Sequence, residues 1–125
     1  MIDNVLMSLK NAYLGLLYCF KTQRNMVIHL AAGIVILLLA LFLQVSLTGL
    51  LFLLTAISMV IVAEAFNTAI EKAIDLYTRE RSELAKISKD VAAGAVLLTA
   101  FFAVIVGLIV LGPPLWRLVV RIFSG

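Results

Sequence analysis

The chain has 125 residues, of which 64% are hydrophobic and only 14% are charged. This composition is too apolar for an ordinary soluble domain and indicates an integral membrane protein. The formal net charge of +3 is small, and the basic residues stand near the ends of the apolar runs. That distribution favours contact with anionic lipid headgroups, and no motif for binding nucleic acid is found.

The first segment, 3–22, predicts an amphipathic helix that lies on the membrane surface. Charged residues interrupt it, so it does not have the apolar core of a cleaved secretory signal. Apolar residues recur at helical spacing on one side, and polar residues occupy the other side. The apolar set is Val5, Leu6, Leu9, Leu16, Leu17 and Phe20, and the polar set is Asn4, Ser8, Lys10 and Asn11.

The next part of the chain predicts two transmembrane helices joined by a tight turn. No Asp, Glu, Lys or Arg occurs from Asn25 to Ala63. One crossing needs about 20 apolar residues, so this stretch accommodates two, which we place at 26–43 and 48–70. The most polar residues inside it run from Gln44 to Thr48 and precede Gly49. These residues are therefore expected to form the turn.

A third crossing is expected at 91–111, which makes the chain a single all-α membrane domain, 1–125. Pro113 and Pro114 follow this crossing and are expected to end the helix. Five of the ten Lys and Arg residues lie between the second and third crossings, and none lies in the turn between the first two. By the positive-inside rule, the N-terminus and the segment 71–90 are cytoplasmic.

A row of polar residues extends from the apolar part of the second crossing toward its C-terminal end. Glu64 lies near the end of the apolar run, where an ionised carboxylate is costly unless it is paired or hydrated. Asn67, Glu71 and Asp75 follow at offsets of three, seven and eleven, which places all four residues within about 80° on one helix face. Such a row suits a reaction between a lipid headgroup and a water-soluble partner. Alternatively, Glu71 and Asp75 are ordinary solvated charges at a helix end.

The chemistry of this row points to a hard cation. Clustered carboxylates with an amide oxygen nearby are ligands that magnesium prefers, especially when phosphate oxygens complete its shell. Lys89, just before the third crossing, is placed to hold a phosphate. The small residues from Ala92 to Ala95 favour close helix packing in lipid. His29 is a possible titrating group, but an interfacial histidine bonded to a backbone carbonyl is the favoured interpretation.

Several segments resemble one known family. They are EAFNTAIE (64–71), AKISKDVAAGAVLL (85–98), SLKNAYLG (8–15) and RNMVIH (24–29). The sequence resembles the small prokaryotic lipid kinases, the diacylglycerol kinase and undecaprenol kinase family, and is most similar to the undecaprenol kinase branch of Gram-positive bacteria. The resemblance extends over nearly the whole chain, to about Leu111.

This resemblance implies a homotrimer in the bacterial cytoplasmic membrane, with active sites shared between neighbouring subunits. It also implies transfer of the γ-phosphate of ATP, bound with Mg²⁺, to the hydroxyl group of a membrane lipid alcohol. Undecaprenol, giving undecaprenyl phosphate, is the expected acceptor, and diacylglycerol is the alternative.

The resemblance further assigns roles to individual residues. Glu64 is implied as the general base on the lipid hydroxyl, and Gly94 joins it in contacting the lipid. Glu71 is implied as a magnesium ligand, with position 23 as a second one. The implied contacts to ATP are Lys10, Gln23, Asn67, Glu71, Asp75, Glu80, Lys89 and Asp90.

Position 23 departs from the family pattern. Most relatives carry a glutamate before the Arg-Asn pair, whereas this chain has Gln23. An amide oxygen still binds magnesium but brings no negative charge. Lower nucleotide affinity is one expected consequence. A non-catalytic membrane protein, used for assembly or ion binding, is the alternative.

Overall fold

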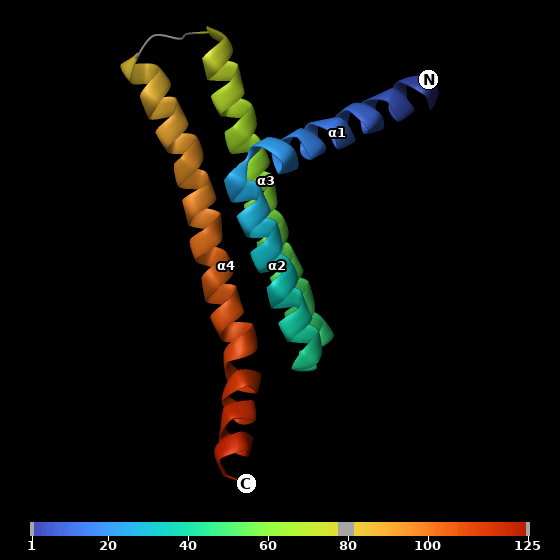
Figure 1. Ribbon diagram of the computed structural model, residues 1–125, viewed down its shortest axis with the longest axis vertical. Coiled ribbons are helices and arrows are strands. Elements are labelled where there is room, and N and C mark those ends of the chain that lie inside the picture. Colours follow the sequence, from blue (N-terminus) through green and yellow to red (C-terminus); the bar gives the residue numbers. More distant parts are fainter. Residues whose placement is uncertain (1, 78–81, 125) are drawn as a thin grey trace.

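The computed structural model describes residues 2–77 and 82–124, with side chains from Asn4 onward. The described residues form four helices and no strand: α1 (Ile2–Thr22), α2 (Arg24–Phe42), α3 (Leu47–Tyr77) and α4 (Glu83–Phe123), as Figure 1 shows. Helices α2, α3 and α4 are each long and apolar enough to cross a membrane. The predicted all-α architecture with three such helices is therefore confirmed.

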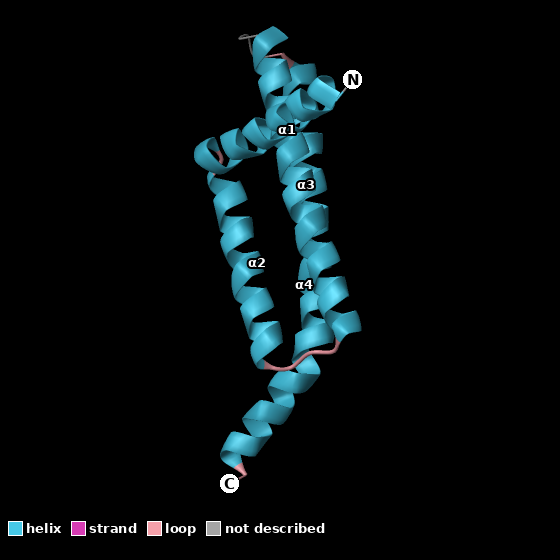
Figure 2. Cartoon of the chain, turned by 90° about the vertical axis from the view of Figure 1, so that its right-hand side faces the viewer, coloured by secondary structure: helices cyan, strands magenta, loops and turns pink. Residues whose placement is uncertain are grey.

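Helix α1 projects sideways from the other three helices (Figures 1 and 2). The change in direction follows Gln23, whose backbone is extended with φ −106° and ψ 111° and so separates α1 from α2. Around this junction Cys19 and Met26 are buried, at 7% and 0% exposure, whereas most of α1 is exposed. This geometry is compatible with a helix on the membrane surface, and its placement there remains a prediction.

Helix α2 ends in a hydrogen-bonded reversal. The N–H of Val45 donates to the carbonyl of Ala40 at 3.0 Å, and the N–H of Gln44 donates to that of Leu41 at 3.1 Å. Gln44 adopts φ 52°, the left-handed conformation in which this Schellman motif normally has glycine. The reversal satisfies two of the carbonyls that a helix leaves unpaired at its C-terminal end.

Helix α3 begins earlier than the polar residues of the turn suggested. The N–H of Gly49 donates to Ser46 Oγ at 3.2 Å, so Ser46 serves as the N-cap of α3. Thr48, the expected first residue of this crossing, lies in the first turn of the helix, which begins one residue earlier, at Leu47. The connection is shorter than expected because a serine cap starts a helix at the next residue.

Helix α3 is the centre of the fold and packs against both α2 and α4. The core between them consists mainly of small and aliphatic side chains: Ala40, Leu53, Ala56, Val106 and Leu111. Glycines permit the closest approaches. A Cβ on Gly33 of α2 would lie 2.8 Å from Ile57 Cγ2 of α3, and one on Gly49 would lie 3.0 Å from Val110 Cγ1 of α4. Small residues thus let the helices approach closely without a large apolar core.

The expectation that Pro113 and Pro114 end the third crossing is wrong. Helix α4 runs through both prolines to Phe123, and its last turns extend past the connection between α2 and α3 (Figure 2). Proline fixes φ near the helical value, but it removes its own N–H donor and its ring crowds the carbonyl four residues earlier. Neighbouring groups can compensate for that loss in a membrane helix, so the helix continues.

Candidate active site

Glu64 and Thr68 are the most deeply buried polar residues of the described chain, each 2% exposed. Thr68 Oγ1 donates to the backbone carbonyl of Glu64 at 2.9 Å, which satisfies the threonine inside the helix bundle. In the antiparallel packing of α2 on α3, the Gly33–Ile57 contact places Met26 opposite Glu64. A carboxylate is thus buried inside the helix bundle, where an ordinary structural role is costly.

The four residues of the predicted row change from buried to exposed along α3. Glu64 is 2% and Asn67 is 8% exposed, Glu71 is half-buried, and Asp75 is exposed. The row therefore connects the interior of the bundle with the end of α3. At 1.5 Å per residue, it covers about 16 Å of the helix.

Asn67 and Glu71 form one polar unit on this row. Asn67 Nδ2 donates to Glu71 Oε1 at 3.1 Å, and Asn67 Oδ1 is buried without a hydrogen-bond partner among the described residues. An unpaired buried acceptor calls for a cation or a donor. Together with the Glu71 carboxylate it supplies hard oxygen ligands, so the residues present fit magnesium.

One chain does not supply a complete metal shell from its described residues. No group of three or more His, Cys, Asp or Glu side chains that could hold a metal is found there. Magnesium commonly uses only one or two carboxylates and takes its other ligands from water and phosphate. The donor set is therefore suited to a metal that arrives with a nucleotide.

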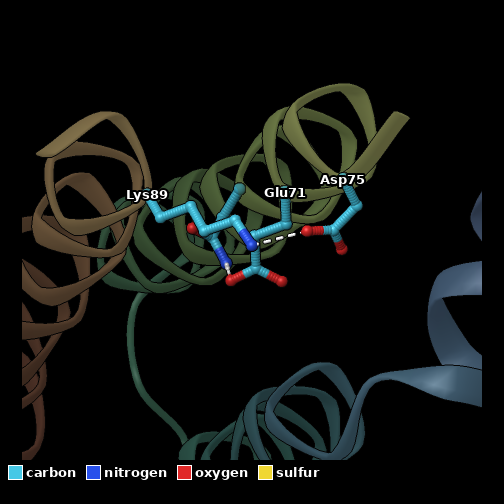
Figure 3. Close-up of polar contacts among 4 residues, drawn as sticks. Glu71, Asp75 and Lys89 are labelled. Carbon is cyan, nitrogen blue, oxygen red and sulfur yellow. Dashed lines mark hydrogen bonds and ion pairs between the residues drawn. The ribbon is translucent and has the colours of Figure 1, made fainter. Parts of the chain in front are cut away.

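Lys89 of α4 lies beside the exposed end of the same row. Its Nζ lies 2.6 Å from Asp75 Oδ1, and the Glu71 carboxylate projects into the space beside this pair (Figure 3). Lys89 and Asp75 are fourteen residues apart in the chain and meet because α3 and α4 are antiparallel neighbours. The result is a cation beside two carboxylates at the end of the bundle where α3 ends and α4 begins.

The other α4 candidates lie near this cluster. Asp90 is exposed and Gly94 is half-buried. A Cβ on Gly94 would meet no atom within 4 Å, so the space beside it is open. Close packing was the favoured interpretation for the small residues here, but among them only Ala92 is buried, at 6% exposure, while Ala93 and Ala95 are exposed. These small residues therefore do not all pack against other helices of the same chain.

The remaining candidates lie apart from the row. Gln23 is half-buried, and its Nε2 donates to Thr22 Oγ1 at 3.0 Å. Lys10 is exposed on α1. No hydrogen bond or ion pair among the described residues joins either of them to Glu71. Glu80, predicted to contact ATP, lies outside the described residues.

His29 was interpreted too simply from the sequence. No hydrogen bond from its imidazole to a backbone carbonyl is found among the described residues, contrary to expectation. Instead, His29 is half-buried and lines the apolar space between α2, α3 and α4. Thr68 was also overlooked as a member of the site. Its spacing of four from Glu64 was the available signal, since residues four apart share a helix face.

The fold and the site together define a class. An all-α membrane protein with a buried carboxylate, a phosphate-suited lysine and hard oxygen ligands at one end of its bundle has the features of a membrane-embedded lipid kinase. Phosphoryl transfer requires these groups, since catalysis there rests mainly on positioning and on neutralising phosphate charge.

Comparison with known proteins identifies the family. Residues 10–111 match the family model "Prokaryotic diacylglycerol kinase". The chain is 43% identical to the diacylglycerol kinase of Synechocystis sp. over an alignment of 118 residues. This alignment covers 94% of this chain and 67% of that protein. It is 36% identical to the undecaprenol kinase of Bacillus subtilis over 95 residues, an alignment that covers 76% of this chain and 77% of that protein. The chain belongs to the prokaryotic diacylglycerol kinase family and is a lipid kinase.

Proposed function

We propose that this protein transfers the γ-phosphate of ATP to undecaprenol, at the cytoplasmic surface of a bacterial membrane. The observation that carries the proposal is the row on α3, which leads from the buried Glu64 to the exposed Asp75. A lipid hydroxyl reaches the buried end of this row from the membrane, and a nucleotide reaches the exposed end from water. The RNMVIH segment, similar to the undecaprenol kinase branch, favours the polyprenol as acceptor.

At the buried end, Glu64 acts as general base. Its carboxylate takes the proton from the lipid hydroxyl while that oxygen attacks the γ-phosphorus. The new O–P bond forms as the bond between the γ-phosphorus and the β–γ bridging oxygen breaks, and ADP leaves. Burial of Glu64 among apolar side chains keeps bulk water from competing as the acceptor.

At the exposed end, the chain's own residues hold the nucleotide. Glu71 and the free Oδ1 of Asn67 would hold magnesium, which supplies neutralisation of phosphate charge when it is bound. Lys89 turns from Asp75 toward a phosphate oxygen, and Asp75 keeps the ammonium group at this end of the bundle. Lys10 from α1 and Gln23 from the junction between α1 and α2 complete the site in an assembled homotrimer.

Direct assay of the acceptor tests the proposal. Protein purified in detergent is mixed with γ-labelled magnesium ATP and with undecaprenol or dioleoylglycerol in parallel mixed micelles. Preferential labelling of undecaprenol is expected. Preferential labelling of dioleoylglycerol overturns the choice of acceptor, and absence of label in both lipids with folded protein overturns the proposed reaction.

Diacylglycerol is the second candidate acceptor. The observation in its favour is the similarity to the Synechocystis protein, since the alignment covers nearly all of this chain. The reaction steps are the same for either alcohol, because each presents a hydroxyl group at the membrane surface.

A further inference from the structure

An apolar groove runs along the membrane-embedded part of the fold. It lies between α2, α3 and α4 and encloses about 510 Å³, within the range of roughly 300–1,000 Å³ typical of small-molecule sites. His29 is the single polar side chain among its lining residues. The groove is therefore suited to hydrocarbon and offers one hydrogen-bonding side chain.

The groove begins about one helical turn from the proposed base. Val60, which lines it, is four residues before Glu64 and shares its face of α3. On α4 the lining extends from Ala100 to Leu115, about 22 Å at 1.5 Å per residue. This distance exceeds half of the roughly 30 Å hydrocarbon thickness of a bilayer. A chain leaving Glu64 can thus follow the groove toward the opposite leaflet.

The described part of the chain leaves space within the groove. Gly107 and Gly112 line it, and a Cβ on either would meet no atom within 4 Å. The contacts of α4 are made with α3, and α2 also packs on α3, so the groove opens between α2 and α4.

We propose that this groove holds the hydrocarbon chain of the acceptor and selects an alcohol of the polyprenol type. The inference rests on the proposed function, in which Glu64 deprotonates the acceptor hydroxyl. A polyprenol has no polar atom beyond its hydroxyl, so it leaves no group unsatisfied in an apolar groove. Diacylglycerol carries two ester groups close to its hydroxyl and would find one side-chain donor, His29. Each unpaired polar group buried in such a site is unfavourable.

A substitution that fills the groove far from Glu64 can test the groove separately from the proposed base. In the antiparallel packing of α3 and α4, the Gly49–Val110 contact places Gly107 about 18 Å along the bundle from Glu64. The eight main-chain bonds of geraniol, a ten-carbon prenol, span at most about 12 Å at roughly 1.5 Å each. Geraniol therefore ends before Gly107, whereas undecaprenol passes it.

The experiment compares Gly107→Leu with the parent chain on undecaprenol, geraniol and dioleoylglycerol. Ile109→Phe is the matched control, because Ile109 is an exposed α4 residue outside the lining set. In Gly107→Leu the ratio of undecaprenol to geraniol phosphorylation is expected to fall at least tenfold. The control is expected to keep the parent ratio, and the oligomeric state is expected to stay the same in both.

Two results would overturn the groove's role, and a third would overturn its selectivity. One is an unchanged undecaprenol to geraniol ratio in Gly107→Leu, and another is an altered oligomeric state, which would make a second copy of the chain the occupant. The third is an equal loss with dioleoylglycerol, which would show that the groove accepts any lipid chain.

A binding experiment tests the groove without requiring phosphate transfer. A prenol with a photoreactive group at its far end is crosslinked to the parent chain, and the labelled peptides are identified by mass spectrometry. Label on α4 between Ala100 and Leu115, lost in Gly107→Leu and retained in Ile109→Phe, supports the groove even if no phosphate is transferred. Label elsewhere refutes it while leaving the kinase reaction intact.

Discussion

Lys89 on α4 and Asp75 on α3 form an ion pair in which Nζ lies 2.6 Å from Oδ1. The two side chains are 39% and 52% exposed, and exposed pairs contribute little to stability because water and salt screen them. The pair therefore contributes little to the stability of the bundle, and in the proposed reaction it holds the ammonium group near the incoming phosphate.

Replacing the lysine tests this interpretation. Lys89→Met is expected to lower kcat/KM for ATP at least tenfold, because a hydrogen bond to a charged group contributes about 1.5–3 kcal/mol. The unfolding temperature of the protein in detergent is expected to change little. Lys86→Met, at an exposed lysine three residues earlier, is the control and should retain most activity. Equal losses in the two variants would mean that only general positive charge matters.

Glu64→Gln is expected to reduce phosphate transfer by about 10²–10⁴-fold, the usual contribution of a general base. The amide has nearly the same shape as the carboxyl group, so folding and oligomeric state should be preserved. Single-turnover transfer to undecaprenol measures the effect. Glu83→Gln, at an exposed glutamate in the first turn of α4, is the control. A fully active Glu64→Gln protein would refute the proposed base.

Much of the architecture was predictable from the sequence because membrane helices are specified by long apolar runs. The row from Glu64 to Asp75 was also predictable, since helical periodicity alone places its four residues on one face. Its change from buried to exposed follows from the position of Glu64 near the end of the apolar run. Both predictions depend on properties within a single helix.

Features that depend on pairs of helices were not predictable in this way. The Lys89–Asp75 pair requires the register of α4 against α3, which no local pattern specifies. The same is true of the approach between Gly33 and Ile57, and of the groove. Pro113 was misjudged for a different reason: a proline weakens a helix locally, but the surrounding packing decides whether the helix ends.

Restoring the family's charge at position 23 is expected to strengthen nucleotide binding. Gln23→Glu adds a carboxylate to a site that would hold magnesium, so KM for magnesium ATP should fall about tenfold, which corresponds to about 1.4 kcal/mol. Asn25→Asp adds the same charge two residues away and is the control for a general electrostatic effect. Steady-state kinetics at varied magnesium concentration distinguish the two variants. An unchanged KM in Gln23→Glu would place residue 23 outside the metal site.

The Gly33–Ile57 contact predicts an effect on stability that is measured without a catalytic assay. A Cβ at residue 33 would lie 2.8 Å from Ile57 Cγ2, and the branched isoleucine side chain has little freedom to move away. Gly33→Ala is therefore expected to destabilise the protein by about 1–3 kcal/mol, as overpacking usually does.

Thermal unfolding in detergent, followed by circular dichroism, measures this effect, and two further variants sharpen it. Gly15→Ala adds a Cβ where no atom lies within 4 Å, and it should be neutral or stabilising by up to about 1 kcal/mol, since alanine is the better helix former. Adding Ile57→Ala to Gly33→Ala removes the obstructing Cγ2. The double variant should then lose less stability than the two single changes added together, because residues in contact do not act independently. Additive losses would show that α2 and α3 do not meet at these residues.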